Sequence, residues 1–109
     1  MAMIAETAAW VAAFRARESA EPDRRLHDPY AEHFAPKTPV PDNALARGIV
    51  VQRTVAFDEI ILKLLRDERI DTVINLACGY DARPYRLSLP ADLHWIEIDL
   101  PPVIARKTD

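Results

Sequence analysis

Residues 72–99 read TVINLACGYDARPYRLSLPADLHWIEID, and this stretch decides the fold. It opens at residues 72–77 with a β-branched and apolar run that is typical of a buried strand. Gly79, one of two glycines in the chain, follows this run and permits a sharp backbone turn. A second strand is predicted over residues 93–98, and Asp99 ends it. Two strands joined through a glycine turn, with an acid at the end of the second, predict the opening half of a nucleotide-binding α/β unit.

The spacing and composition of the turn indicate the kind of nucleotide. Asp99 follows Gly79 at the interval where an acidic side chain holds ribose hydroxyls in such folds. The turn itself, residues 77–81 (ACGYD), lacks the G-x-G-x-x-G pattern that brings backbone N–H groups close to a pyrophosphate. A loop with one glycine suits an adenosyl ligand without phosphates. The residues therefore favour S-adenosylmethionine over NAD, and a nicotinamide-binding half-domain stays as an alternative.

Four ordered segments carry a resemblance to a known family. Residues 75–83 (NLACGYDAR), followed by YRL at 85–87, resemble the first motif of the leucine carboxyl methyltransferase family, which includes bacterial O-methyltransferases of secondary metabolism. Residues 97–101 (EIDLP), with Lys107 after them, are similar to its second motif. Upstream, residues 28–31 (DPYA) and the R-T-x-x-F-D pattern from Arg53 to Asp58 resemble two further segments. The resemblance extends over most of the chain.

The resemblance implies the N-terminal part of a Rossmann-like, class I S-adenosylmethionine-dependent O-methyltransferase of α/β class. Residues 1–70 would form a helical cap and a covering helix, and residues 71–109 would begin the nucleotide-binding sheet. The implied acceptor is a small molecule with a carboxyl or hydroxyl group, and no residue is assigned as a catalytic base. The implied cofactor-binding residues are Arg17, Arg53, Ala77, Cys78, Gly79, Asp81, Asp99 and Leu100.

Two of these residues are expected to bind the carboxylate of the methionine moiety. Arg53 matches the arginine of the R-T-x-x-F-D segment, and a guanidinium offers a planar fork that fits a carboxylate. Counting back without a gap from the DPYA segment makes Arg17 the second basic residue. An alternative for Arg53 is an exposed helical arginine paired with Asp58 or Glu59.

Helices are predicted on both sides of a proline-rich linker at residues 35–41. One spans residues 4–18, with Trp10 and Phe14 expected to pack against the sheet. A short one follows Asp28 as N-cap. The longest spans residues 43–68, begins at an Asp42 or Asn43 cap, and has an apolar stripe that should cover one face of the sheet. That stripe comprises Phe57, Ile60, Ile61, Leu64 and Leu65.

Composition excludes several functional classes. Net charge is 14 − 17 = −3 with no basic tract, which argues against nucleic acid as a partner. No segment has the apolar length of a membrane span. The single cysteine, Cys78, excludes an internal disulfide and fits a reducing cytoplasm. His27 and His33 lie six residues apart and cannot share one helical face, so no metal site is predicted.

The length of 109 residues limits the chain to one domain. The family's domain is considerably longer, which suggests a truncated product, a fragment, or a chain completed by a partner. The first strand would then leave an open edge, which favours pairing with a second copy. We therefore expect no methyl transfer by the isolated monomer. A non-catalytic remnant is the other alternative.

Overall fold

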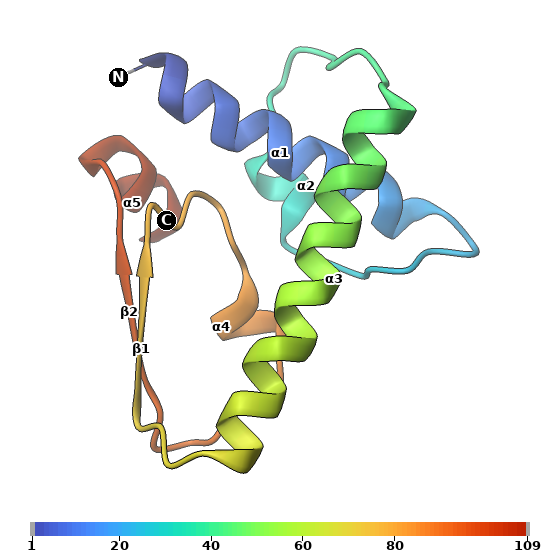
Figure 1. The fold of residues 1–109 in the computed structure, drawn as a ribbon. Helices are drawn as coiled ribbons and strands as arrows, with labels where there is room; N and C mark the ends of the chain where they lie inside the picture. Colours follow the sequence, from blue (N-terminus) through green and yellow to red (C-terminus); the bar gives the residue numbers. More distant parts are fainter. Residues whose placement is uncertain (1, 109) are drawn as a thin grey trace.

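The computed structural model describes residues 2–108, and the side chains of residues 6–108. Three helices come first, and two strands alternate with two shorter helices after them (Figure 1). The elements are α1 (Ala2–Ala20), α2 (Ala31–Phe34), α3 (Ala44–Asp67), β1 (Thr72–Leu76), α4 (Arg83–Arg86), β2 (His94–Ile98) and α5 (Pro101–Thr108). The chain is thus a mixed α/β structure. Over residues 2–108, no helix has the length and hydropathy needed to span a bilayer.

The two strands form a parallel sheet, which confirms the predicted strand pair. Ile74 lies opposite Ile96, and Leu76 lies opposite Ile98. These four apolar side chains are between 45% and 70% exposed and share one face of the sheet, because side chains alternate between faces. Among the described residues β1 pairs only with β2, so its other edge carries no strand.

The predicted N-terminal cap of α3 is confirmed, but that of α2 is not. Asn43 caps α3, and its side-chain oxygen accepts a hydrogen bond from the Ala46 N–H at 3.0 Å. Asp28 does not cap α2 directly. Its carboxylate accepts from the Tyr30 N–H at 3.0 Å, and the helix begins only at Ala31. The acid therefore shapes the turn that leads into the helix.

The buried core surrounds α1 rather than the sheet. On one side Ala12 packs in a cluster with Phe34, Tyr80 and Val103. On another side Phe14 belongs to a cluster formed with the proline-rich linker and α3, whose other buried members are Ala13, Val40 and Val50. The expectation that Trp10 and Phe14 pack on the sheet is wrong, since Trp10 is 46% exposed and Phe14 contacts helix and linker. The helices pack mainly on one another and on the linker, because a sheet of two strands offers little surface to cover.

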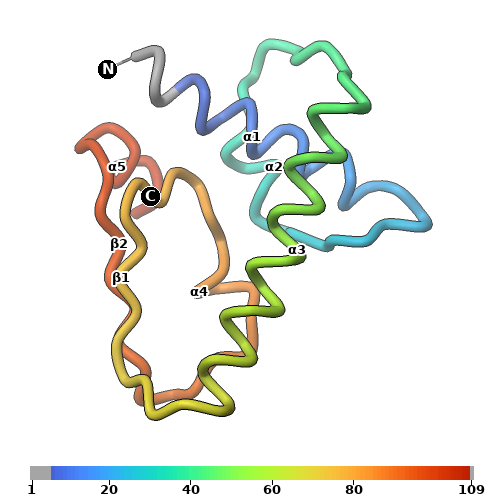
Figure 2. Tube along the Cα trace, viewed as in Figure 1, coloured from blue at the N-terminus to red at the C-terminus, as the bar shows by residue number. Residues whose placement is uncertain are grey.

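Helix α3 does not cover the sheet as its apolar stripe predicted. Phe57, Ile60 and Leu64 remain about half exposed. Figures 1 and 2 show α3 standing away from the two strands, and Phe57 and Ile61 of α3 line the cavity described below together with Val73 and Trp95 of the sheet. Polar contacts from α4, described below, hold α3 in place there.

Candidate functional site

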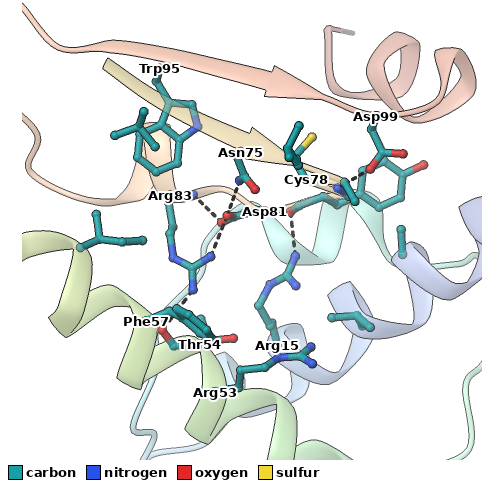
Figure 3. A pocket seen from close by; sticks show the side chains of 18 of the residues that line it. Arg15, Arg53, Thr54, Phe57, Asn75, Cys78, Asp81, Arg83, Trp95 and Asp99 are labelled. Carbon is teal, nitrogen blue, oxygen red and sulfur yellow. Dashed lines mark hydrogen bonds and ion pairs between the residues drawn. The ribbon is translucent and has the colours of Figure 1, made fainter. Parts of the chain in front are cut away.

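A cavity of about 810 Å³ lies where α1, α3 and the C-terminal end of β1 meet. The turn after β1 and the acid at the end of β2 also line it (Figure 3). Six of the eight predicted cofactor-binding residues belong to its lining: Arg53, Ala77, Cys78, Gly79, Asp81 and Asp99. The residues of the turn and Asp99 lie together because the two parallel strands end at the same edge, and Arg53 comes from α3.

The turn after β1 has an unusual backbone. Ala77 and Gly79 have φ angles of 53° and 54°, in the left-handed region. A Cβ added to Gly79 would lie 3.6 Å from the Ala8 Cβ, an ordinary contact. Backbone conformation rather than lack of space therefore requires glycine at position 79. The strained Ala77 was not foreseen, because alanine carries no sequence signal for a positive φ.

Asp99 holds this turn by its carboxylate. One oxygen accepts a hydrogen bond from the Gly79 N–H at 2.7 Å, and the other accepts from the Leu100 N–H at 2.7 Å. The acid and the glycine, separated by 20 residues, are therefore in direct contact. Leu100 itself is not part of the cavity lining, and its described role is this backbone hydrogen bond.

Asp81 lies in the cavity wall but is engaged by protein groups. Its carboxylate accepts from the Asn75 side chain at 2.9 Å and from the Arg83 guanidinium at 2.7 Å. It also accepts from the Arg83 N–H at 2.9 Å. Asp81 and Arg83 thus brace the turn, and the first role of this acid is to shape the loop before α4.

Arg53 projects from α3 at the cavity and is exposed. Within residues 6–108 its side chain has no ion-pair partner. The alternative pairing with Asp58 does not occur, because Asp58 binds Arg83 and Arg86. A charged, solvated guanidinium is thus available at the cavity.

The structure does not bring Arg17 to the cavity. Its guanidinium donates to the Val40 carbonyl and lies 3.5 Å from the Asp42 carboxylate, beside the linker. Arg15 lines the cavity instead. Its side chain is 8% exposed, and it donates to the Asp28 carboxylate at 3.0 Å and to the Tyr80 carbonyl at 2.7 Å.

Helical periodicity could have predicted that Arg15 lies on the face of α1 that lines the cavity. This residue follows Val11 by four positions and Ala8 by seven, and all three line the cavity. Arg17 lies two positions further and faces elsewhere. Counting back from the DPYA segment without a gap selected the wrong face of α1.

Cys78 is a buried free thiol beside the partly buried ion pair of Lys107 and Glu97. Burial raises its pKa, and the ammonium of Lys107, 3.8 Å from its sulfur, only partly offsets this effect. The thiol therefore stays neutral at pH 7. Lys107 pairs with Glu97 and donates to the Asp81 carbonyl at 2.9 Å, which ties α5 to β2 and to the turn. The side chains described contain no group of three His, Cys, Asp or Glu placed to hold a metal ion.

Comparison with known proteins identifies relatives that match more than nine tenths of this chain. The family model for leucine carboxyl methyltransferase matches residues 8–109. A protein of Frankia alni is 41% identical over 110 residues, which cover 91% of this chain and 38% of the relative. A protein of Mycolicibacterium vanbaalenii is 36% identical over 127 residues, covering 96% of this chain and 41% of the relative. Both are named as candidate S-adenosyl-L-methionine-dependent methyltransferases.

The chain spans about two fifths of the length of the curated relatives it matches. The match begins within α1 and includes the cavity, the glycine turn and Asp99. The chain belongs to the leucine carboxyl methyltransferase family.

Proposed function

We propose that this chain forms the cofactor-binding part of an S-adenosylmethionine-dependent O-methyltransferase with a Rossmann-like fold. The contact between Asp99 and Gly79 carries this proposal. It puts an acid at the end of β2 beside the turn after β1, in the wall of a cavity of about 810 Å³. Pockets for small ligands have volumes on the order of 300–1,000 Å³. The names of the relatives support the same cofactor.

The residues at the turn suit a ribose better than a pyrophosphate. A carboxylate has about four lone-pair sites, and Asp99 uses two of them for backbone N–H groups. The others can accept hydrogen bonds from ribose hydroxyls. A pyrophosphate needs free N–H groups, but the Gly79 N–H already donates to a carboxylate that would repel it. This local charge argues against NAD.

On the α3 side of the cavity, the protein offers a partner for a ligand carboxylate. Arg53 is exposed at the cavity and has no ion-pair partner within residues 6–108. We assign it to the carboxylate of the methionine moiety. Arg15 lies in the same wall, but its bonds to Asp28 and Tyr80 fix it as a support for the turn.

The chemistry follows from holding two reactants in place. When bound, S-adenosylmethionine supplies a methyl group on a sulfonium for in-line displacement by an acceptor oxygen. The residues of this chain contribute orientation of the donor, which is the main requirement of such a reaction. A carboxylate acceptor needs no general base, whereas a hydroxyl acceptor needs one where it must be deprotonated. We propose that the acceptor is a small molecule.

We also propose a cytoplasmic location. The free thiol of Cys78 is consistent with a reducing compartment, and cell fractionation would test the location.

Titration calorimetry tests this function. The chain is expected to bind S-adenosylhomocysteine at least about tenfold more tightly than NADH, because the turn favours ribose over pyrophosphate. Equal affinities, or a preference for NADH, would sink the assignment and support the nicotinamide alternative. Absence of binding to either ligand in a folded sample would support a non-catalytic remnant.

We further propose that the chain self-associates through the free edge of β1. That edge adjoins the apolar face formed by Ile74, Leu76, Ile96 and Ile98, and such edges pair readily with other chains. Sedimentation at micromolar concentration should show a dimer or larger species that Ile96→Lys reduces. An active monomer would contradict both this association and the expected inactivity of the isolated chain.

A further inference from the structure

Asp58 of α3 is bound by both arginines of α4. Its carboxylate accepts from the Arg83 Nε at 2.7 Å. The two terminal nitrogens of Arg86 donate to it at 2.7 and 2.9 Å in a bidentate pair. Asp58 is buried, and the side chains of both arginines are at most 15% exposed. Fork-shaped, shielded pairs of this kind fix geometry more strongly than surface pairs do.

Arg83 connects this carboxylate to the turn that lines the cavity. One terminal nitrogen donates to Asp81 at 2.7 Å, and the other donates to the Thr54 carbonyl of α3 at 3.2 Å. One guanidinium therefore bridges α3 and the loop after β1 (Figure 3). Thr54 follows Arg53 directly in the sequence.

The position of Arg53 depends on what holds α3. The N-terminal half of α3 packs on α1, where Val50 and Phe14 share one buried cluster. Further along, the apolar stripe is about half exposed and gives little packing against the sheet. The contacts of Arg83 and Arg86 with α3 thus supply its attachment to the sheet side of the cavity.

We propose that Asp58, with Arg83 and Arg86, is a positioning residue that sets the distance between Arg53 and the glycine turn, and thereby determines recognition of the amino-acid end of the cofactor. The proposal rests on the function proposed above. It assigns to Asp58 a role in specificity through Arg53 and no contact with the ligand. Loss of the carboxylate leaves the turn and Asp99 in place but removes the ion pairs between α3 and α4 that lie five residues after Arg53.

Two ligands separate this role from general stability. S-adenosylhomocysteine carries the amino-acid end, and methylthioadenosine lacks it. Asp58→Asn is expected to weaken binding of S-adenosylhomocysteine by about tenfold and to leave methylthioadenosine within about twofold. In an Arg53→Ala background the same substitution should change neither affinity, because the residue through which it acts is absent. Glu59→Gln, the same charge change on the next residue, is the matched control and should change neither.

A second variant covers the case in which Asp58→Asn does not fold. Arg86→Lys keeps the charge but loses the bidentate fork on Asp58, while Arg83 still binds both Asp58 and Asp81. It should cause the same selective loss for S-adenosylhomocysteine. The positioning role would be overturned if both ligands lost affinity equally or if neither did. It would also be overturned if Asp58→Asn weakened S-adenosylhomocysteine binding just as much in the Arg53→Ala background. Failure of the unaltered protein to bind S-adenosylhomocysteine would overturn the proposed function and this inference with it.

Discussion

Replacing Lys107 with alanine is expected to lower the free energy of unfolding by about 1.5–3 kcal/mol, the cost of losing a hydrogen-bonded ion pair that is largely shielded from solvent. The Lys107 side chain is 3% exposed and that of Glu97 is 15% exposed. Truncation leaves the Glu97 carboxylate shielded without its cation, and the Asp81 carbonyl loses its donor. The loss would be a large part of the stability of a domain of this size.

Urea denaturation measures this effect. Lys63→Ala removes an exposed lysine from α3 and should stay within about 0.5 kcal/mol of the unaltered protein. Combining Lys107→Met with Glu97→Gln removes both charges and should recover part of the loss. A change below about 1 kcal/mol for Lys107→Ala would mean that the ion pair does not attach α5 to the sheet.

Replacing Arg53 with alanine is expected to weaken binding of S-adenosylhomocysteine by about 10–100-fold, since a hydrogen bond to a charged group contributes about 1.5–3 kcal/mol. Methylthioadenosine, without the carboxylate, should bind as before. The guanidinium has no ion-pair partner among residues 6–108, so its removal leaves no unpaired carboxylate in the protein.

Calorimetric titration of both ligands makes this comparison. Arg66→Ala is the matched control, because Arg66 is an exposed arginine of the same helix whose ion-pair partner among residues 6–108 is its neighbour Asp67. It should alter neither affinity. If Arg53→Ala weakens both ligands equally, Arg53 supports the fold and the carboxylate assignment fails.

The sequence predicted those elements whose signals are local. A β-branched run, an asparagine cap and a glycine turn each depend on neighbouring residues, and β1, α3 and the turn after β1 occur where those signals lie. The pairing of β1 with β2 was predictable because strands that follow each other in the sequence usually lie side by side, here through a crossover that contains α4. Gly79 and Asp99 met because the two parallel strands end at one edge.

The predictions that were wrong concern features that depend on contacts between residues far apart in the sequence. Whether the α3 stripe is buried depends on what packs against it, and Phe57 and Ile61 instead line the cavity together with β1 and Trp95. The choice between Arg15 and Arg17 depends on which face of α1 meets Tyr80 and Asp28, far along the chain. The network around Asp58 joins residues up to 29 positions apart through arginine forks, and no local pattern in the sequence specifies such a geometry.

The central claim is that the adenosyl ligand lies over the turn at Gly79 and beside Asp99. The most direct test follows the backbone amide signals by two-dimensional NMR while S-adenosylhomocysteine is added. Both the Gly79 and the Leu100 N–H donate to Asp99, so ribose binding to that carboxylate should shift these two signals strongly, and methylthioadenosine should shift them as well. Binding that leaves both signals unchanged while amides elsewhere in residues 2–108 move would contradict the account.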